Sequence, residues 1–296
     1  MRHATARLVK LIPLLGAFAL AAAACNSGSS STTAAGSATP SESMMPSESM
    51  MPSESMSPGT QMMMQPGADK MHAKITSPKS GVVLTGNTLN MHVAVTGYRL
   101  ACDHAGKADV EGLGHYHVLL DGALVNMFCT TTAAVSMQNV APGQHMIEVV
   151  PAQDDHTEII PNAFKMPFTY QPSNPLPEIT SPGATGTPAI QILDPANGVT
   201  LSGPFTVKVQ ISNYTPSCGL MGKPDVAGYG HWHVNLDAMT GPMMGMGTML
   251  GMSCTTTFHG TTVGLKTGTT HTLIALLTDN GHAPINVESQ ITFTVG

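Results

Sequence analysis

The stretch GHYHVLLDG spans residues 114–122, and a near copy, GHWHVNLD, spans residues 230–237. In each copy two histidines flank one aromatic residue, and an aspartate follows shortly after. Side chains of a β-strand alternate between its two faces. The face with Tyr116, Val118 and Leu120 therefore belongs to a core, and the histidines point away from it. The stretch predicts a strand whose outer face carries two imidazoles, with Cα atoms about 7 Å apart.

The two stretches belong to a repeat that covers most of the chain. ITSPKSGVVLTGNTLNMHVAV (75–95) matches ILDPANGVTLSGPFTVKVQIS (192–212). Cys102 and Cys218 stand 116 residues apart and open matching segments. Such self-similarity predicts two domains joined by a proline- and glycine-rich linker. The predicted bounds are 74–171 and 188–296 for the domains and 172–187 for the linker.

Within each copy, short segments alternate between apolar and polar residues and are separated by Gly, Pro and Asn. NMHVAVTGY (90–98) and TVKVQISNY (206–214) show this period of two. The pattern predicts an all-β protein, with two tandem immunoglobulin-like antiparallel β-sandwich domains after a disordered N-terminal tether. The net charge is −6 and only 10% of residues are charged, so nothing in the composition favours nucleic-acid binding.

The order of motifs resembles bacterial immunoglobulin-like repeats. Each copy has an I-x-x-P-x-x-G opening, at 75–81 and 192–198, and the first copy continues with LDG and PG-x-H. The whole pattern is similar to an exported bacterial domain family of uncharacterised function, whose members carry a GHHH-type strand and a late PG-x-H strand. The resemblance implies export and a β-sandwich, and it implies no activity.

The N-terminus predicts export. MRHATARLVK precedes the apolar run LIPLLGAFALAAAAC, which is too short for a typical membrane span. We expect residues 1–24 to be a signal peptide. The end of this run resembles the lipobox of bacterial lipoproteins, which implies lipid attachment to Cys25 and anchoring at the extracytoplasmic face of the cell membrane. The alternative is an ordinary secreted protein with a spare thiol.

Residues 25–73 contain few core-forming residues apart from methionine and include the repeat SESMMP, which predicts a disordered tether. A second methionine-rich segment, MTGPMMGMGTMLGM, spans residues 239–252. Thioethers are soft ligands that select Cu(I), although a low-complexity spacer and a flexible partner surface are the alternatives. The candidate thioether ligands are Met44, Met45, Met50, Met51, Met62, Met63, Met64, Met243, Met244 and Met246.

Four cysteines remain after the lipobox. In an oxidising compartment an even number predicts disulfides. We expect Cys102 to pair with Cys129 and Cys218 with Cys254, because bonds between the copies would cross the linker twice. The alternatives are bonding between the copies and cysteine as a metal ligand.

The histidine pairs are candidate metal ligands. Two imidazoles on one face suit a single ion, and copies of a late loop supply a third histidine. The candidate ligands are His115, His117 and His156 in the first copy and His231, His233 and His282 in the second. The ion would be copper or zinc. The alternatives are a structural polar cluster and recognition of an unknown ligand. We expect His145 and His271 to have structural roles, in packing and in turn hydrogen bonds. Asp109 and Asp225 stand shortly before the motifs.

Together these features predict a non-enzymatic cell-envelope lipoprotein with tandem binding modules that hold copper or zinc. The first alternative is a structural or adhesive surface protein without metal, acting through an unknown protein partner. A remote alternative is a metalloenzyme similar to Cu/Zn superoxide dismutase, which is also a β-sandwich with an H-x-H strand. Its further metal ligands and closing motif are not found in this sequence.

Overall fold

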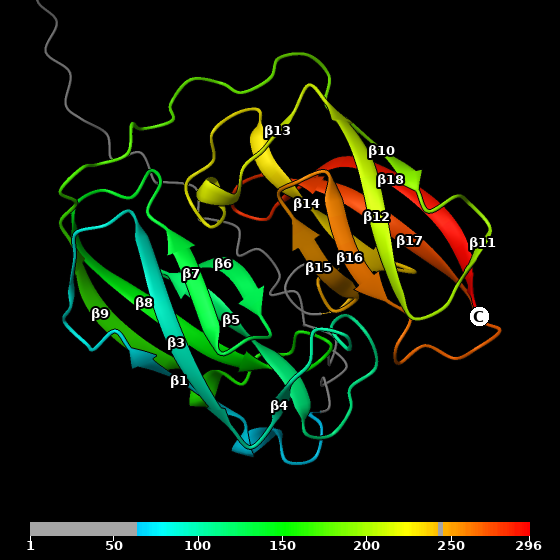
Figure 1. Ribbon diagram of the computed structural model, residues 1–296, viewed down its shortest axis with the longest axis horizontal. Helices are drawn as coiled ribbons and strands as arrows, with labels where there is room; N and C mark the ends of the chain where they lie inside the picture. The colour runs from blue at the N-terminus through cyan, green and yellow to red at the C-terminus, as the bar shows by residue number, and fades with distance from the viewer. Residues whose placement is uncertain (1–63, 242–244) are drawn as a thin grey trace, which may run out of the picture. The chain divides into compact units, whose positions relative to one another are not determined.

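The computed structural model describes residues 64–241 and 245–296 (Figure 1). The predicted signal peptide, Cys25 and most of the tether lie outside the described residues. Among the described residues, no helix has the length and apolar character needed to span a bilayer. The described residues all belong to the unit Pro58–Gly296, and the following concerns that unit alone.

The first half of this unit forms two sheets. One has the strand order β1-β3-β7, and the other has the order β2-β9-β8-β5-β4, with β6 also paired to β5 (Figure 1). The elements are η1 (Ala68–Lys70), β1 (His72–Ser77), β2 (Val83–Leu84), β3 (Thr88–Thr96), β4 (Arg99–Leu100), β5 (Leu113–Leu120), β6 (Ala123–Phe128), β7 (Thr132–Ser136), β8 (Gly143–Ala152), η2 (Ile160–Asn162) and β9 (Phe164–Tyr170).

The second half repeats this topology. Its sheets have the orders β10-β12-β16 and β11-β18-β17-β14-β13, with β15 also paired to β14. The elements are β10 (Ala189–Asp194), β11 (Val199–Leu201), β12 (Pro204–Ser212), β13 (Thr215–Pro216), η3 (Cys218–Leu220), β14 (Tyr229–Leu236), β15 (Met249–Ser253), β16 (Thr257–Thr261), β17 (Thr270–Thr278) and β18 (Pro284–Val295). The predicted all-β, immunoglobulin-like sandwich fold is confirmed.

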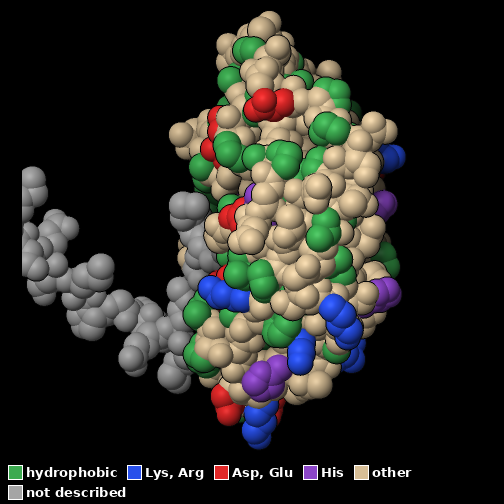
Figure 2. All heavy atoms as spheres, turned by 90° about the vertical axis from the view of Figure 1, so that its left-hand side faces the viewer, with side chains coloured by type: hydrophobic (Ala, Val, Ile, Leu, Met, Phe, Trp, Pro, Cys, Tyr) green, Lys and Arg blue, Asp and Glu red, His purple; other side chains and the backbone are tan. Residues whose placement is uncertain are grey.

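The aromatic face of each H-x-H strand lies in a core, as the alternation predicts. Tyr116, Val118 and Leu120 of β5 are buried in the first core, and Trp232 and Val234 of β14 are fully buried in the second. The two cores are separate clusters, one in each half. On the face of the molecule shown in Figure 2, most of the side chains at the surface are uncharged.

The cysteines pair within each half. Cys102 bonds Cys129 across a sequence separation of 27 residues, and Cys218 bonds Cys254 across 36. Each bond ties the residues before an H-x-H strand to the end of the strand that pairs with it, β6 or β15. In the chain-entropy model, closing loops of this length contributes roughly 3–4 kcal/mol each.

The last residues assigned to the tether by composition are packed against the first half. The backbone N–H of Gln65 donates to Gln153 Oε1 at 2.8 Å, and the Gln65 side chain donates to Leu113 O. Met71 is buried with Ile159, and β1 begins at His72, two residues before the predicted boundary. Single residues such as Gln65 and Met71 hold this segment in place. A periodic apolar pattern is therefore absent from residues 64–73.

The two halves contact each other through matching segments. Gly106 lies against the backbone of Met249 at the start of β15, and Gly222 lies against Leu124 of β6. Both glycines have positive φ, 71° and 70°, and a Cβ at either position would collide with the opposing backbone. The contact is therefore reciprocal: a loop of each half docks on the strand that follows the H-x-H strand of the other.

Candidate metal centres

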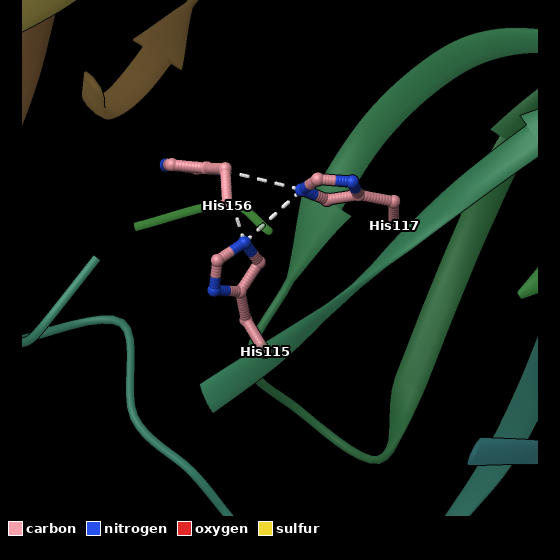
Figure 3. Close-up of side chains that lie close together, drawn as sticks. All are labelled: His115, His117 and His156. Atoms are coloured by element: carbon pink, nitrogen blue, oxygen red, sulfur yellow. Dashed lines mark hydrogen bonds between the residues drawn. The ribbon is translucent and has the colours of Figure 1, made fainter. Parts of the chain in front are cut away.

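The first candidate centre consists of His115, His117 and His156 (Figure 3). His115 and His117 project from one face of β5, and His156 lies in the loop after β8. His115 Nε2 lies 3.1 Å from His117 Nε2 and 3.0 Å from His156 Nδ1, and His117 Nε2 lies 3.2 Å from His156 Nδ1. Three ring nitrogens from two separate segments thus converge on one point.

The second candidate centre repeats this arrangement with His231 and His233 on β14 and His282 after β17. His231 Nε2 lies 3.0 Å from His233 Nε2 and 2.9 Å from His282 Nδ1, and His233 Nε2 lies 3.3 Å from His282 Nδ1. Among the described residues, these two groups are the ones in which three side chains lie close enough to hold one metal ion. The structure therefore brings together all six histidines that the sequence indicated, in the two predicted groups.

Strand pairing explains how the third histidine reaches each pair. Ala152, the last residue of β8, pairs with His115, so the following loop starts beside the first imidazole. His156 and His282 then adopt left-handed backbone conformations, with φ of 64° and 72°. Such conformations are uncommon for residues other than glycine and cost about 1–3 kcal/mol, and they cluster at functional sites. Both halves hold the same strained residue at the same place.

The glycine of each motif is required by the neighbouring strand. Gly114 lies against the backbone carbonyl of Ala152, and Gly230 lies against that of Thr278, so a Cβ at either position would collide with the backbone. Glycine thus permits β8 and β17 to approach the H-x-H strand at the point where the third histidine departs. The G-H-x-H order follows from this close approach.

The aspartate of each motif closes the turn at the far end of the strand. Asp121 accepts hydrogen bonds from Met146 N at 2.8 Å and from His145 Nδ1 at 2.7 Å. Asp237 accepts from Thr272 N and His271 Nδ1, both at 2.8 Å. His145 and His271 therefore have the turn role that the sequence favoured, and they lie outside both centres.

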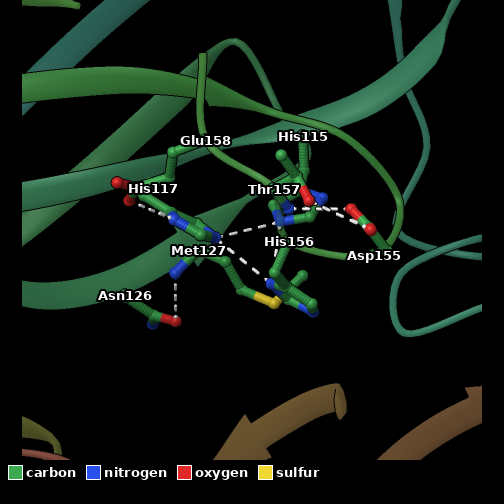
Figure 4. Close-up of polar contacts among 8 residues, drawn as sticks. All are labelled: His115, His117, Asn126, Met127, Asp155, His156, Thr157 and Glu158. Atoms are coloured by element: carbon green, nitrogen blue, oxygen red, sulfur yellow. Dashed lines mark hydrogen bonds and ion pairs between the residues drawn. The ribbon is translucent and has the colours of Figure 1, made fainter. Parts of the chain in front are cut away.

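In the first centre, two ring nitrogens point away from the point where the three rings meet. The hydrogen bonds of these nitrogens determine which nitrogens carry protons. His156 Nε2 donates to the carbonyl of Met249, on the other half, at 2.7 Å. His117 Nδ1 donates to Glu158 Oε1 at 2.7 Å (Figure 4). A neutral imidazole has one N–H, so His156 Nδ1 and His117 Nε2 both present lone pairs to the centre.

The second centre is oriented in the same way by the first half. His282 Nε2 donates to the carbonyl of Leu124 at 2.9 Å, which leaves its Nδ1 as a lone pair. Each half therefore fixes the tautomer of one histidine in the other half's centre. His115 Nδ1 and His231 Nδ1 are buried without a hydrogen-bond partner.

Burial keeps the imidazoles of His115 and His156 neutral. His115 and His156 are fully buried, and His117 is 1% exposed. Burial, with repulsion from the neighbouring rings, lowers the pKa of His115 well below its ordinary value, and burial lowers the pKa of His156 to about 3. A neutral imidazole is the form that ligates metals.

The same cause acts in the second centre, and the two centres influence each other. Burial lowers the pKa of His231 and His233 well below the ordinary value, and lowers that of His282 to about 4. Repulsion from His156 of the first centre adds to the lowering for His233. The two centres thus lie close enough for a charge on one to be felt at the other.

The nitrogen separations approach those of a metal site. Nitrogens that bind one tetrahedral Zn²⁺ ion at about 2.0–2.1 Å stand about 3.3–3.4 Å apart. The separations of 3.0–3.2 Å in the first centre fall a few tenths of an ångström short of this. Small rotations of the rings would accommodate an ion of this size, with a fourth coordination position left over.

The acidic residues before the motifs order loops and do not join the centres. Asp109 accepts hydrogen bonds from Gln153 Nε2 and Asp155 N, both at 3.0 Å. Asp225 accepts a long hydrogen bond of 3.4 Å from Asn280 Nδ2. In the first half, Asp109 thereby braces the loop that carries His156.

The methionine predictions fall mainly outside the described residues. Of the candidate thioethers, Met64 is 48% exposed and Met246 is buried at 6% exposed. The others lie outside: Met44, Met45, Met50, Met51, Met62, Met63, Met243 and Met244.

Sequence reasoning missed three participants around the centres. Glu158 stands two residues after His156 and forms an isolated β-bridge with Ala152, a pairing that no sequence period marks. Leu124 and Met249 act through backbone carbonyls, for which a sequence gives no signal. Both of these depend on the docking of one half on the other.

No protein-family model matches this sequence, and comparison with curated proteins finds no match. Among solved structures, the chain is similar to fibronectin(III)-like modules of CbhA from Clostridium thermocellum, with 12% identity over 75% of this chain and 93% of that chain and a TM-score of 0.25. It is also similar to CopC from Methylosinus trichosporium OB3b, with 14% identity over 36% of this chain and 99% of that chain and a TM-score of 0.22. At these TM-scores the similarities add no argument. The strand pairing itself defines a tandem immunoglobulin-like protein with two buried three-histidine clusters.

Proposed function

We propose that this chain is a non-enzymatic, exported metal-binding protein that holds one copper or zinc ion in each of its two histidine centres. The observation that carries the proposal is the convergence of three ring nitrogens within 3.0–3.2 Å in the first centre, repeated in the second. Three imidazoles suit both Zn²⁺ and copper. Lipid attachment at Cys25 would hold the protein at the cell membrane.

The distribution of protons favours an ion over a metal-free polar cluster. In the first centre, His117 and His156 both present lone pairs, so the three close contacts share at most one proton, that of His115. Neutral groups cannot satisfy all three contacts at once, and an unsatisfied buried polar atom costs about 1–3 kcal/mol. A cation at the centre interacts favourably with all three lone pairs.

The burial of the centres supports a holding role rather than catalysis. In a catalytic zinc site with three protein ligands, the fourth coordination position must be reachable by water or substrate. His115, His117 and His156 are at most 1% exposed. Because each centre hydrogen-bonds the other half, a bound ion would also stabilise the contact between the halves.

The test is metal stoichiometry of the full chain, exported, purified without affinity histidines and loaded with Zn²⁺ or with Co²⁺ as a spectroscopic probe. The variants His115→Ala/His117→Ala and His231→Ala/His233→Ala each remove one centre. His92→Ala is the matched control, because His92 is an exposed histidine on β3.

We expect two ions per wild-type and control chain, one per double variant, and Co²⁺ absorption bands typical of tetrahedral nitrogen coordination. A wild-type chain that takes up no ion, or a stoichiometry that both double variants share with the control, would overturn the proposal. The metal-free structural or adhesive function would then be favoured.

A further inference from the structure

Each centre has a methionine directly across the strand pair from one of its ligands. Met127 of β6 pairs with His117 of β5, and Met252 of β15 pairs with His233 of β14. Residues directly opposite in an antiparallel pair lie on the same face, with Cβ atoms about 4.5–5.5 Å apart. The side chain of Met127 therefore lies on the same side of the sheet as the histidine rings (Figure 4).

These methionines have no place in the cores. The strand neighbours Val125 and Phe128 pack in or against the first core, whereas Met127 belongs to neither core cluster and is only partly buried. Leu250 is part of the second core, and Met252 is likewise partly buried outside it. Packing of the sandwiches therefore does not account for a methionine at these positions.

Both methionines line one cavity of about 420 Å³ between the halves. Asn126 and Met127 of β6 form one side, and Gly251 and Met252 of β15 form another. The cavity thus touches the strand beside each centre. It brings the side chains of both methionines to one space, and no histidine of either centre is among its lining residues.

The repeat retains this residue independently of the histidines. MFCTTT at 127–132 and MSCTTT at 252–257 share the methionine, the disulfide cysteine and the three threonines. The residue between methionine and cysteine differs, Phe128 in one copy and Ser253 in the other. The two halves have diverged at most positions, so a methionine kept beside both centres agrees with a shared role.

We propose that Met127 and Met252 supply a thioether ligand to the first and second centre, respectively, and that the completed three-histidine, one-methionine sites select copper, held as Cu(I), over zinc. This inference rests on the proposed function. Thioethers are soft donors that favour Cu(I), whereas Zn²⁺ gains little from them beyond three imidazoles. The long, flexible methionine side chain can move from the cavity wall to the open fourth position of each centre.

The test compares full chains that differ only at these two positions, so that the methionines of the N-terminal segment contribute equally. Met127→Leu/Met252→Leu preserves size and apolar character, a change that proteins usually tolerate even in a core. Met146→Leu is the matched control, because Met146 is an exposed methionine on β8. Cu(I) affinity is measured by competition with a chromophoric Cu(I) chelator, Zn²⁺ affinity by competition with a zinc dye, and Cu–S scattering by X-ray absorption.

We expect the double variant to bind Cu(I) about tenfold more weakly or worse at both centres, to lose Cu–S scattering relative to wild type, and to keep its Zn²⁺ affinity within about threefold. Unchanged Cu(I) affinity, in a chain whose histidine variants do lose their ions, would overturn this inference and leave the proposed function standing. Equal losses for Cu(I) and Zn²⁺ would also overturn it, because they would assign the methionines to packing. Loss of neither ion in the histidine variants would overturn both proposals.

Discussion

The two histidine centres share their ring geometry but differ in what lies behind one ring. In the first, His117 Nδ1 donates to Glu158 at 2.7 Å, and the carboxyl side chain is only 16% exposed. In the second, Pro284 occupies the matching place, two residues after His282, and His233 Nδ1 has no side-chain partner among the described residues. The duplication has kept the ligands and changed their surroundings.

The fold sets the positions of the ligands, and local chemistry sets the strength with which each ligand binds. The ligands are placed by strand pairing and by the left-handed loop residue, and both halves share these features. A carboxylate behind a ligand histidine fixes its tautomer and raises its basicity. The two centres should therefore bind the same ion with different affinities. Substitutions at three places test which features the two halves share and which differ.

The largest effect is expected from the feature that the halves share, their reciprocal docking. Gly106→Ala would drive a Cβ into the backbone at Met249, and Gly222→Ala would do the same at Leu124. Neither backbone can move without opening the contact between the halves, so we expect each change to lower the free energy of unfolding by about 3 kcal/mol or more. Urea unfolding of the full chain measures this.

Gly112→Ala is the control for backbone strain, because Gly112 has φ of 75° but no atom within 4 Å of the position that a Cβ would take. It should cost only about 1 kcal/mol. Equal losses for Gly112→Ala and Gly106→Ala would show that the docking of the halves contributes nothing to stability.

A smaller effect is expected from the carboxylate that distinguishes the centres. Glu158→Gln should weaken Zn²⁺ binding at the first centre by about 10–100-fold, because the loss of a charged partner behind a ligand has effects of this size. Competition titration that resolves two sites would then give nearly equal dissociation constants. Glu148→Gln is the control, because Glu148 lies on β8 of the same half but pairs with Lys165. Two wild-type sites of equal affinity would contradict the comparison.

Much of this architecture could be predicted from the sequence because strand alternation is local. The aromatic faces of β5 and β14, the disulfide partners and the three-histidine groups follow from period, repeat offset and the expected sheet order. His156 and His282 could be assigned because a loop leaving a neighbouring strand must start beside the pair.

The remaining features depend on register and docking, which leave no local signal. Met127 lies opposite His117 only in one register, and a slip by one residue would turn it to the other face. The carbonyl partners Leu124 and Met249 exist only when the halves are docked. Packing of residues 64–73 depends on single anchors such as Met71, which the composition of a methionine-rich tail conceals.

The smallest effect compares two matching lysines at the contact between the halves. Lys107 Nζ donates to three carbonyls, those of Asp103, Thr261 and Val263, at 2.6–2.8 Å. Lys223 Nζ is buried with no hydrogen-bond partner. Burial lowers the pKa of both lysines to about 8, so the buried charge has a cost at both positions. Three hydrogen bonds offset that cost at Lys107, whereas no hydrogen bond offsets it at Lys223.

The two substitutions should therefore have opposite signs. At pH 7, Lys107→Met should lower the free energy of unfolding by about 1–3 kcal/mol, since it removes the donor of three carbonyl groups at a partly buried contact. Lys223→Met should raise it by about 1 kcal/mol, since the cost of burying an unpartnered ammonium group disappears. Urea midpoints of the full chains at pH 7 measure both changes, and a loss of stability in Lys223→Met would contradict the assignment.

The pH dependence of wild type and Lys223→Met separates charge from packing. Burial, opposed by the charge of Asp121, lowers the pKa of Lys223 to about 8, whereas a lysine in the unfolded chain has a pKa of about 10.4. The folded state thus releases this proton first and binds fewer protons than the unfolded state between these values. The contribution of Lys223 to stability should therefore rise from about pH 8 to about pH 10, and the gain of Lys223→Met over wild type should shrink across the same window. A gain that stays constant with pH would assign the effect of Lys223 to the shape of its side chain.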